Sequence, residues 1–190
     1  MSFINFARRE IHLKLVYWGV GLGGKWTNVR AVLRANVPGY DGAYPSVDDV
    51  VELPPTAFDA EGRSLVLRPF LHLHLNPGAL RRSPSRELIV RGADGLVLVC
   101  DSDPSSWTGN LEFLAELDAW LERSGVALSE LPHVVQYNKR DLPEALPVDV
   151  MRATFNRHGA PDFEAVATAG HGVLETFAAI RDAVLAKGLR

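Results

Sequence analysis

The chain has 190 residues, of which 47% are hydrophobic, and this is enough apolar material for the core of one domain covering residues 1–190. The formal net charge of −3 gives no excess of positive charge that would favour nucleic acid as a partner. The single cysteine, Cys100, excludes an internal disulfide, and no apolar run reaches the length of a membrane span. We therefore expect a cytoplasmic protein with no transmembrane segment.

Short apolar runs alternate with segments of helical periodicity, an order typical of α/β folds with a mainly parallel sheet. The first strand is predicted from Ile11 to Trp18, and it leads through a glycine-rich turn into a helix that ends near Asn36. Residues 37–55 contain several Pro and Gly residues, so we expect an irregular connection there, with a short edge strand at residues 50–53.

The second half of the chain continues this alternation after a predicted hairpin. A turn at residues 60–63 predicts two antiparallel strands, the second of which reaches Leu75. Further strands are expected at residues 95–101, 133–138 and 164–167, with helices at residues 85–91 and 107–124, after residue 147 and from residue 173. The predicted class is α/β, with a mixed, mainly parallel sheet flanked by helices.

The turn after the first strand has the sequence GVGLGGKW, which matches the phosphate-binding pattern G-x-x-x-x-G-K-[ST] except at its last position. In that pattern backbone N–H groups surround phosphates, the lysine reaches the β/γ oxygens, and the hydroxyl binds Mg²⁺. The indole of Trp26 has no oxygen, so Mg²⁺ binding is in doubt and no metal ligand is predicted. The candidate phosphate-side residues are Gly19, Gly21, Gly24, Lys25 and Thr27.

A second motif, Asn138-Lys139-Arg140-Asp141, directly follows the strand predicted at residues 133–138. At the carboxyl end of a parallel strand, an Asp carboxylate can accept from two N–H groups of guanine, while Asn and Lys brace the loop and cover the base. Adenine lacks that pair of donors. In this order after a phosphate loop, Asn138, Lys139 and Asp141 predict a site for GDP or GTP.

Each motif also has a purely structural interpretation. The glycine loop could be a tight turn without a ligand, with Lys25 capping its carbonyl groups, and Asp141 could cap a helix. His72 and His74 share one face of a strand, but no carboxylate or cysteine lies near them at ligand spacing. We therefore interpret these two histidines as structural.

From residue 1 to about residue 149 the chain resembles the MglA-like family, the bacterial Ras-like GTPases of gliding motility and cell polarity. The stretches that carry the resemblance are residues 2–6, 9–11, 19–28, 76–78, 92–95 and 138–143. The resemblance implies a Ras-like P-loop GTPase fold and switching between GDP and GTP. It also implies protein partners, including a roadblock-type regulator that acts as the GTPase-activating protein in this family.

The chain departs from the family where the metal and the attacking water would be held. The family has Thr where Trp26 stands, a polar residue where Leu75 stands, and a water-orienting Gln at the expected catalytic position, Ala79. Phosphoryl transfer needs metal, positioned water and charge stabilisation together, so we expect a pseudo-GTPase with weak or absent hydrolysis. Two alternatives stay open: a GTPase switch completed by a partner, with Mg²⁺ held through water or by Thr27, and an adaptor that binds no nucleotide.

Overall fold

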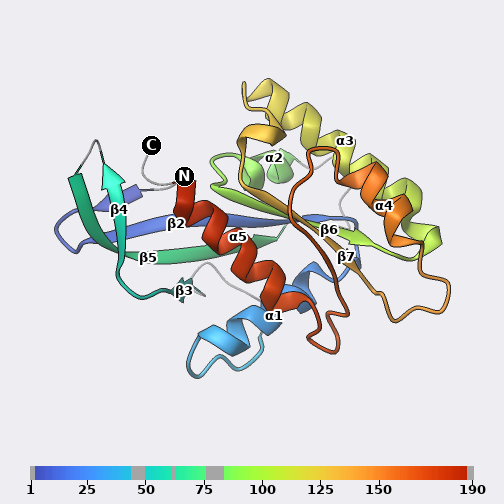
Figure 1. Cartoon of the computed structure of the whole chain (residues 1–190), viewed down its shortest axis with the longest axis horizontal. Coiled ribbons are helices and arrows are strands. Elements are labelled where there is room, and N and C mark those ends of the chain that lie inside the picture. Colours follow the sequence, from blue (N-terminus) through green and yellow to red (C-terminus); the bar gives the residue numbers. More distant parts are fainter. Residues whose placement is uncertain (1–2, 44–49, 61–62, 76–83, 188–190) are drawn as a thin grey trace.

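The computed structural model describes residues 3–43, 50–60, 63–75 and 84–187 (Figure 1). The strands are β1 Phe3–Asn5, β2 Glu10–Gly19, β3 Val50–Glu52, β4 Thr56–Ala60, β5 Arg63–Leu75, β6 Gly95–Asp101, β7 His133–Asn138 and β8 Asp162–Glu164. The α-helices are α1 Lys25–Asn36, α2 Pro84–Val90, α3 Trp107–Arg123, α4 Val148–Phe155 and α5 Val173–Lys187, with 3-10 turns at Pro104–Ser106 and Leu128–Glu130.

The predicted elements are confirmed except at the last strand. That strand was predicted at residues 164–167, but β8 ends at Glu164. The Ala165 N–H still bonds to the Tyr137 carbonyl at 2.8 Å, whereas Val166 pairs with His171 and the chain turns back on itself. The short strand β1, which pairs antiparallel with β2, was not predicted.

The sheet has the order β3-β5-β2-β6-β7-β8, with β1 added beside β2 and β4 beside β5. The pairs β5-β2, β2-β6, β6-β7 and β7-β8 are parallel, whereas β3 and β4 run antiparallel to β5. After β2 the chain moves to one side of that strand to form β3 and β5, and then crosses to the other side to form β6. The carboxyl end of β2 therefore lies at a topological switch point, which is where open α/β sheets bind ligands.

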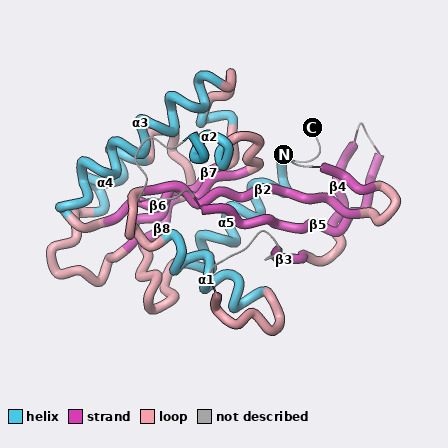
Figure 2. Tube along the Cα trace, turned by 180° about the vertical axis from the view of Figure 1, so that it is seen from behind, coloured by secondary structure: helices cyan, strands magenta, loops and turns pink. Residues whose placement is uncertain are grey.

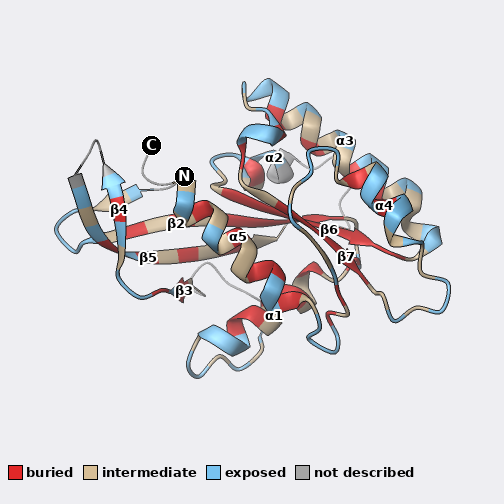
Figure 3. Cartoon of the chain, viewed as in Figure 1, coloured by how far each residue is buried: buried red, intermediate tan, exposed pale blue. Residues whose placement is uncertain are grey.

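Helices cover both faces of the sheet (Figures 1 and 2). Apolar residues of α1 and α5 pack in one core cluster against one face, and those of α2, α3 and α4 pack in a second cluster against the other. The central strand β6 is buried along its whole length (Figure 3). Cys100, on this strand, belongs to the second core cluster. Within the described ranges, no helix combines the length and the apolar character that a membrane span requires.

Candidate nucleotide-binding site

The glycine loop joins β2 to α1 at the switch point of the sheet, and two of its glycines are required by close packing. A Cβ atom on Gly19 would lie 2.1 Å from the carbonyl oxygen of Val99 on β6. Gly24 adopts the left-handed conformation with φ 96°, and a Cβ there would lie 2.1 Å from Nδ2 of Asn138. The loop therefore lies tightly against its neighbours, and α1 begins immediately after Gly24, so its N-terminal N–H groups adjoin the loop.

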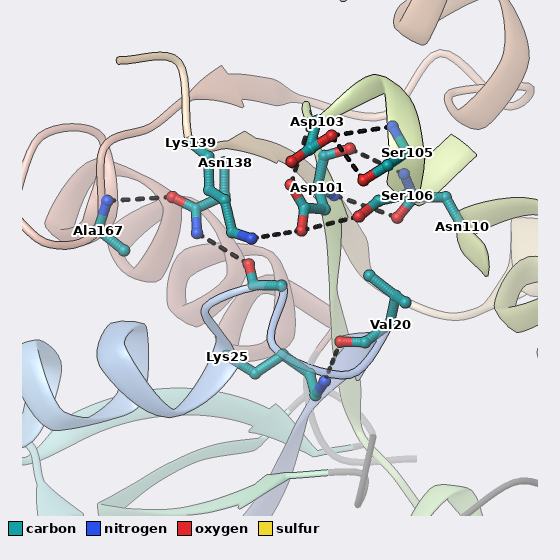
Figure 4. Close-up of polar contacts among 11 residues, drawn as sticks. Val20, Lys25, Asp101, Asp103, Ser105, Ser106, Asn110, Asn138, Lys139 and Ala167 are labelled. Atoms are coloured by element: carbon teal, nitrogen blue, oxygen red, sulfur yellow. Dashed lines mark hydrogen bonds and ion pairs between the residues drawn. The ribbon is translucent and has the colours of Figure 1, made fainter. Parts of the chain in front are cut away.

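Lys25 lies across the loop that precedes it. Its side chain is buried, and Nζ donates to the carbonyl oxygen of Gly19 at 3.0 Å. Nζ also donates to the carbonyl oxygen of Val20 at 2.7 Å (Figure 4). This is the geometry expected of a lysine that caps loop carbonyl groups. Phosphate oxygens are charged acceptors and form stronger bonds with an ammonium than carbonyl groups do, so a bound phosphate could replace these contacts.

Trp26 lies along α1 rather than in the core. Its half-buried ring faces the guanidinium of Arg30 one turn later, with the Arg30 Cζ atom 4.3 Å from the ring centroid. Among the described residues, neither apolar core cluster includes Trp26. Thr27 is half-buried at the next helical position, about 100° further round the axis, so its side chain leaves the helix in a different direction from that of Trp26.

Asn138 joins the phosphate loop to the two loops on the base side of the site. Its Nδ2 donates to the Gly23 carbonyl at 2.8 Å, and its Oδ1 accepts from the Ala167 N–H at 3.0 Å (Figure 4). All of these groups are buried, with Asn138 only 2% exposed. One amide side chain therefore fixes the spacing between the loops that follow β2, β7 and β8.

The rest of the second motif forms a turn directed toward solvent. Lys139 adopts a left-handed φ of 65°, and its Nζ lies 2.6 Å from Oδ2 of Asp101. Asp141 is exposed and lies in the turn, where Leu142 N–H donates to the Lys139 carbonyl at 3.2 Å. The interpretation of Asp141 as a helix cap is wrong, because the next helix, α4, begins only at Val148.

A comparison with curated proteins finds a relative along almost the whole chain. The mutual gliding-motility protein MglA of Myxococcus xanthus (strain DK1622) is 39% identical, in an alignment that covers 97% of this chain and 96% of the relative. The chain belongs to the MglA-like family of small GTPases. This membership and the observed sheet confirm the predicted Ras-like α/β fold, while a scan of family models finds no match.

For this MglA-like chain, the structure brings the candidate residues of both motifs to one edge of the sheet. Three further residues that support the site were not predicted. Asp101 pairs with Lys139, and Arg140 clamps the base-side turn through Nη1 to the Leu146 carbonyl at 2.6 Å and Nε to Glu164 at 3.0 Å. Gln136 donates to Asn28 at 2.9 Å inside the core below the loop. The one feature of the sequence that could have indicated Asp101 is its position as a charged residue at the end of an otherwise apolar strand.

Some predicted positions lie outside the described residues, among them Ala79 and the rest of residues 76–83. Leu75, at the end of β5, packs against the core cluster on the α1 side. In the described part of the chain, no group of three or more His, Cys, Asp or Glu side chains is placed to hold a metal ion. Nε2 of His72 lies 2.9 Å from Nδ1 of His12 and shares a hydrogen bond with it, which supports the structural interpretation of His72.

Proposed function

We propose that this MglA-like chain binds guanine nucleotide without needing Mg²⁺, hydrolyses GTP weakly or not at all, and regulates bacterial motility or polarity through protein partners. The observation that carries the proposal is an asymmetry of the site. On the base side, Asn138 is fixed by two buried hydrogen bonds, whereas on the metal side an indole packed against Arg30 occupies position 26.

The base side supports guanine as the preferred base. Asn138 spaces the loops, and the turn it begins leaves the Asp141 carboxylate exposed at the same edge of the sheet as the phosphate loop. A carboxylate can accept from the two adjacent N–H groups of guanine, and adenine has no such pair. On the phosphate side, the buried ammonium of Lys25 and the N-terminus of α1 supply positive charge for a diphosphate.

The metal side argues against turnover. An indole supplies no oxygen to Mg²⁺, and the chain has Ala79 where the family has its water-orienting Gln. In phosphoryl transfer, an arginine finger alone is worth a factor of about 10³–10⁵ in rate, and metal, positioned water and charge stabilisation are needed together. Loss of both the metal ligand and the water-orienting group would therefore leave a protein that binds nucleotide but hydrolyses it too slowly to act as a timer.

The partner side of the proposal rests on family membership. A roadblock-type regulator is the partner that this family implies, and its contact with a chain that hydrolyses poorly would serve for binding rather than for activation of GTPase chemistry. A pull-down with nucleotide-loaded and nucleotide-stripped protein would measure whether such a partner distinguishes the two forms.

The proposal is tested by titrating the purified chain with fluorescent GDP and ADP, followed by single-turnover hydrolysis of GTP. We expect GDP to bind at least about 100-fold tighter than ADP, and Asp141→Ala to remove that preference. Asp149→Ala is the matched control, because Asp149 is 95% exposed and pairs only with Arg152 among the described contacts. Hydrolysis by the purified chain at the roughly 3–5 × 10⁻⁴ s⁻¹ of an unassisted small GTPase, or at roughly 5–20 s⁻¹ once an activating partner is added, would refute the proposal. Absence of GDP binding would leave an adaptor.

A further inference from the structure

We propose that Asp101 is a positioning residue of the nucleotide site, which acts by holding the ammonium of Lys139 in place beside the phosphate loop. This inference rests on the proposed function, since it concerns the same site. Asp101 ends β6, lies outside both sequence motifs, and is 1% exposed, yet Oδ2 of its carboxylate lies 2.6 Å from Nζ of Lys139 (Figure 4).

The carboxylate of Asp101 is fixed before any ligand arrives. Its Oδ1 accepts from the Asp103 N–H at 3.0 Å, and its Oδ2 also accepts from Ser106 Oγ at 3.1 Å. The backbone of Asp101 is held on both sides by Asn110 of α3, which accepts from its N–H at 3.1 Å and donates to its carbonyl at 2.8 Å. Because every one of these groups belongs to β6, to α3 or to the short segment 102–106 between them, the carboxylate is a rigid acceptor.

Asp101 also lies at the boundary between the two loops of the site. A Cβ atom built on Gly23 of the phosphate loop would lie 3.8 Å from Cβ of Asp101. A carboxylate this deeply buried is costly unless it is paired, and Lys139 supplies the opposite charge. The pair therefore fixes the lysine of the second motif at the point where the phosphate loop and the base-side turn meet.

The backbone of Lys139 indicates that the side chain is needed at this position. Its φ of 65° lies in the left-handed region, which costs a non-glycine residue about 1–3 kcal/mol and persists only where the surrounding structure enforces it. A glycine would adopt this conformation freely but would have no ammonium to offer. The strained lysine together with its buried partner is a preorganised unit, so a nucleotide that contacts Lys139 need not immobilise a flexible side chain.

The test is a double-mutant cycle read as GDP affinity. We expect Asp101→Asn and Lys139→Met each to weaken GDP binding about 10-fold, and the double variant also to be about 10-fold weaker, because the second change removes nothing further. Asp149→Asn is the matched control, with the same change of charge at a 95% exposed position on α4, and it should change affinity less than about 2-fold. Asp101→Glu keeps the charge but displaces it by one methylene, and we expect it to weaken GDP binding as well.

A second readout separates positioning from a general loss of structure. The ratio of GDP to IDP affinity reports the contact between Asp141 and the exocyclic amine of guanine, and it should stay within about 2-fold of wild type in Asp101→Asn. An additive loss of about 100-fold in the double variant, wild-type affinity in Asp101→Asn, or a lost GDP/IDP preference would each overturn the inference. A wild-type chain that binds no GDP would overturn the proposed function and this inference together, whereas tight GDP binding with an additive cycle would overturn this inference alone.

Discussion

Replacement of Asn138 by Ala removes the side chain that joins three loops of the site. The Gly23 carbonyl and the Ala167 N–H both lose their bonds to the Asn138 amide, which measure 2.8 Å and 3.0 Å, and Asn138 itself is 2% exposed. Each buried backbone group left without a partner costs about 1–3 kcal/mol. Since relaxation of the loops lets water reach some of these groups, we expect Asn138→Ala to lower the free energy of unfolding by about 2–4 kcal/mol.

The assay is equilibrium unfolding in urea, with the midpoint and slope measured for the wild type and each variant. Asn36→Ala is the matched control, because Asn36 is exposed and, among the described contacts, its side chain bonds to the Val32 carbonyl of its own helix. That control should change the free energy of unfolding by less than about 0.5 kcal/mol. If Asn138→Ala lost no more stability than Asn36→Ala, Asn138 would not be the brace between the loops.

Three further predictions concern packing and protonation. Gly24→Ala should lower the free energy of unfolding, measured in urea, by about 3 kcal/mol, because the added Cβ would clash with Asn138 at a left-handed φ of 96°. Gly39→Ala is the control: its φ is also left-handed, at 78°, but the space around it is open, so it should lower the free energy of unfolding by about 1 kcal/mol. Burial raises the pKa of Cys100 to about 12, so a thiol reagent at about pH 8 should label the chain only after unfolding, and labelling of the native protein would contradict the burial. Burial and the nearby charges of Lys14 and His72 lower the pKa of His74 from 6.5 to about 4, so the unfolded chain binds the additional proton between these values. The free energy of unfolding should therefore fall as the pH drops from 6.5 toward 4, and His74→Gln should reduce that slope, which an unchanged slope would refute.

Most of the fold could be predicted because its signals are local. The apolar run of β6 and the glycine loop before α1 mark their elements directly, and the structure places both where the sequence predicts them. The end of β8 could not be predicted, because it depends on the bridge between Val166 and His171, and no local sequence pattern indicates that these two residues pair. Strand β1 has three residues, too few for a periodic pattern, and its pairing with β2 is tertiary.

Only those residues of the site that belong to a motif of consecutive residues could be predicted from the sequence. Asn138 and Lys25 were found in this way, and the structure shows the contacts of each. The roles of the candidate residues in binding nucleotide stay predictions. Asp101 was missed because its function depends on an ion pair with Lys139 across two neighbouring strands, and no local pattern records which residues lie opposite each other. The direction of the Trp26 ring could not be predicted from the sequence either, because it depends on packing against Arg30.

The central claim is that this chain binds guanine nucleotide without Mg²⁺, and it is tested most directly by GDP affinity in the presence of Mg²⁺ and of a chelator. The same titrations on Trp26→Thr supply the comparison, because that variant restores the hydroxyl of the phosphate-loop pattern. We predict that the GDP affinity of the wild type differs by less than about 2-fold between Mg²⁺ and the chelator. Trp26→Thr should bind GDP at least about 10-fold tighter in Mg²⁺ than in the chelator. Tight wild-type binding that is lost when Mg²⁺ is removed would contradict the account.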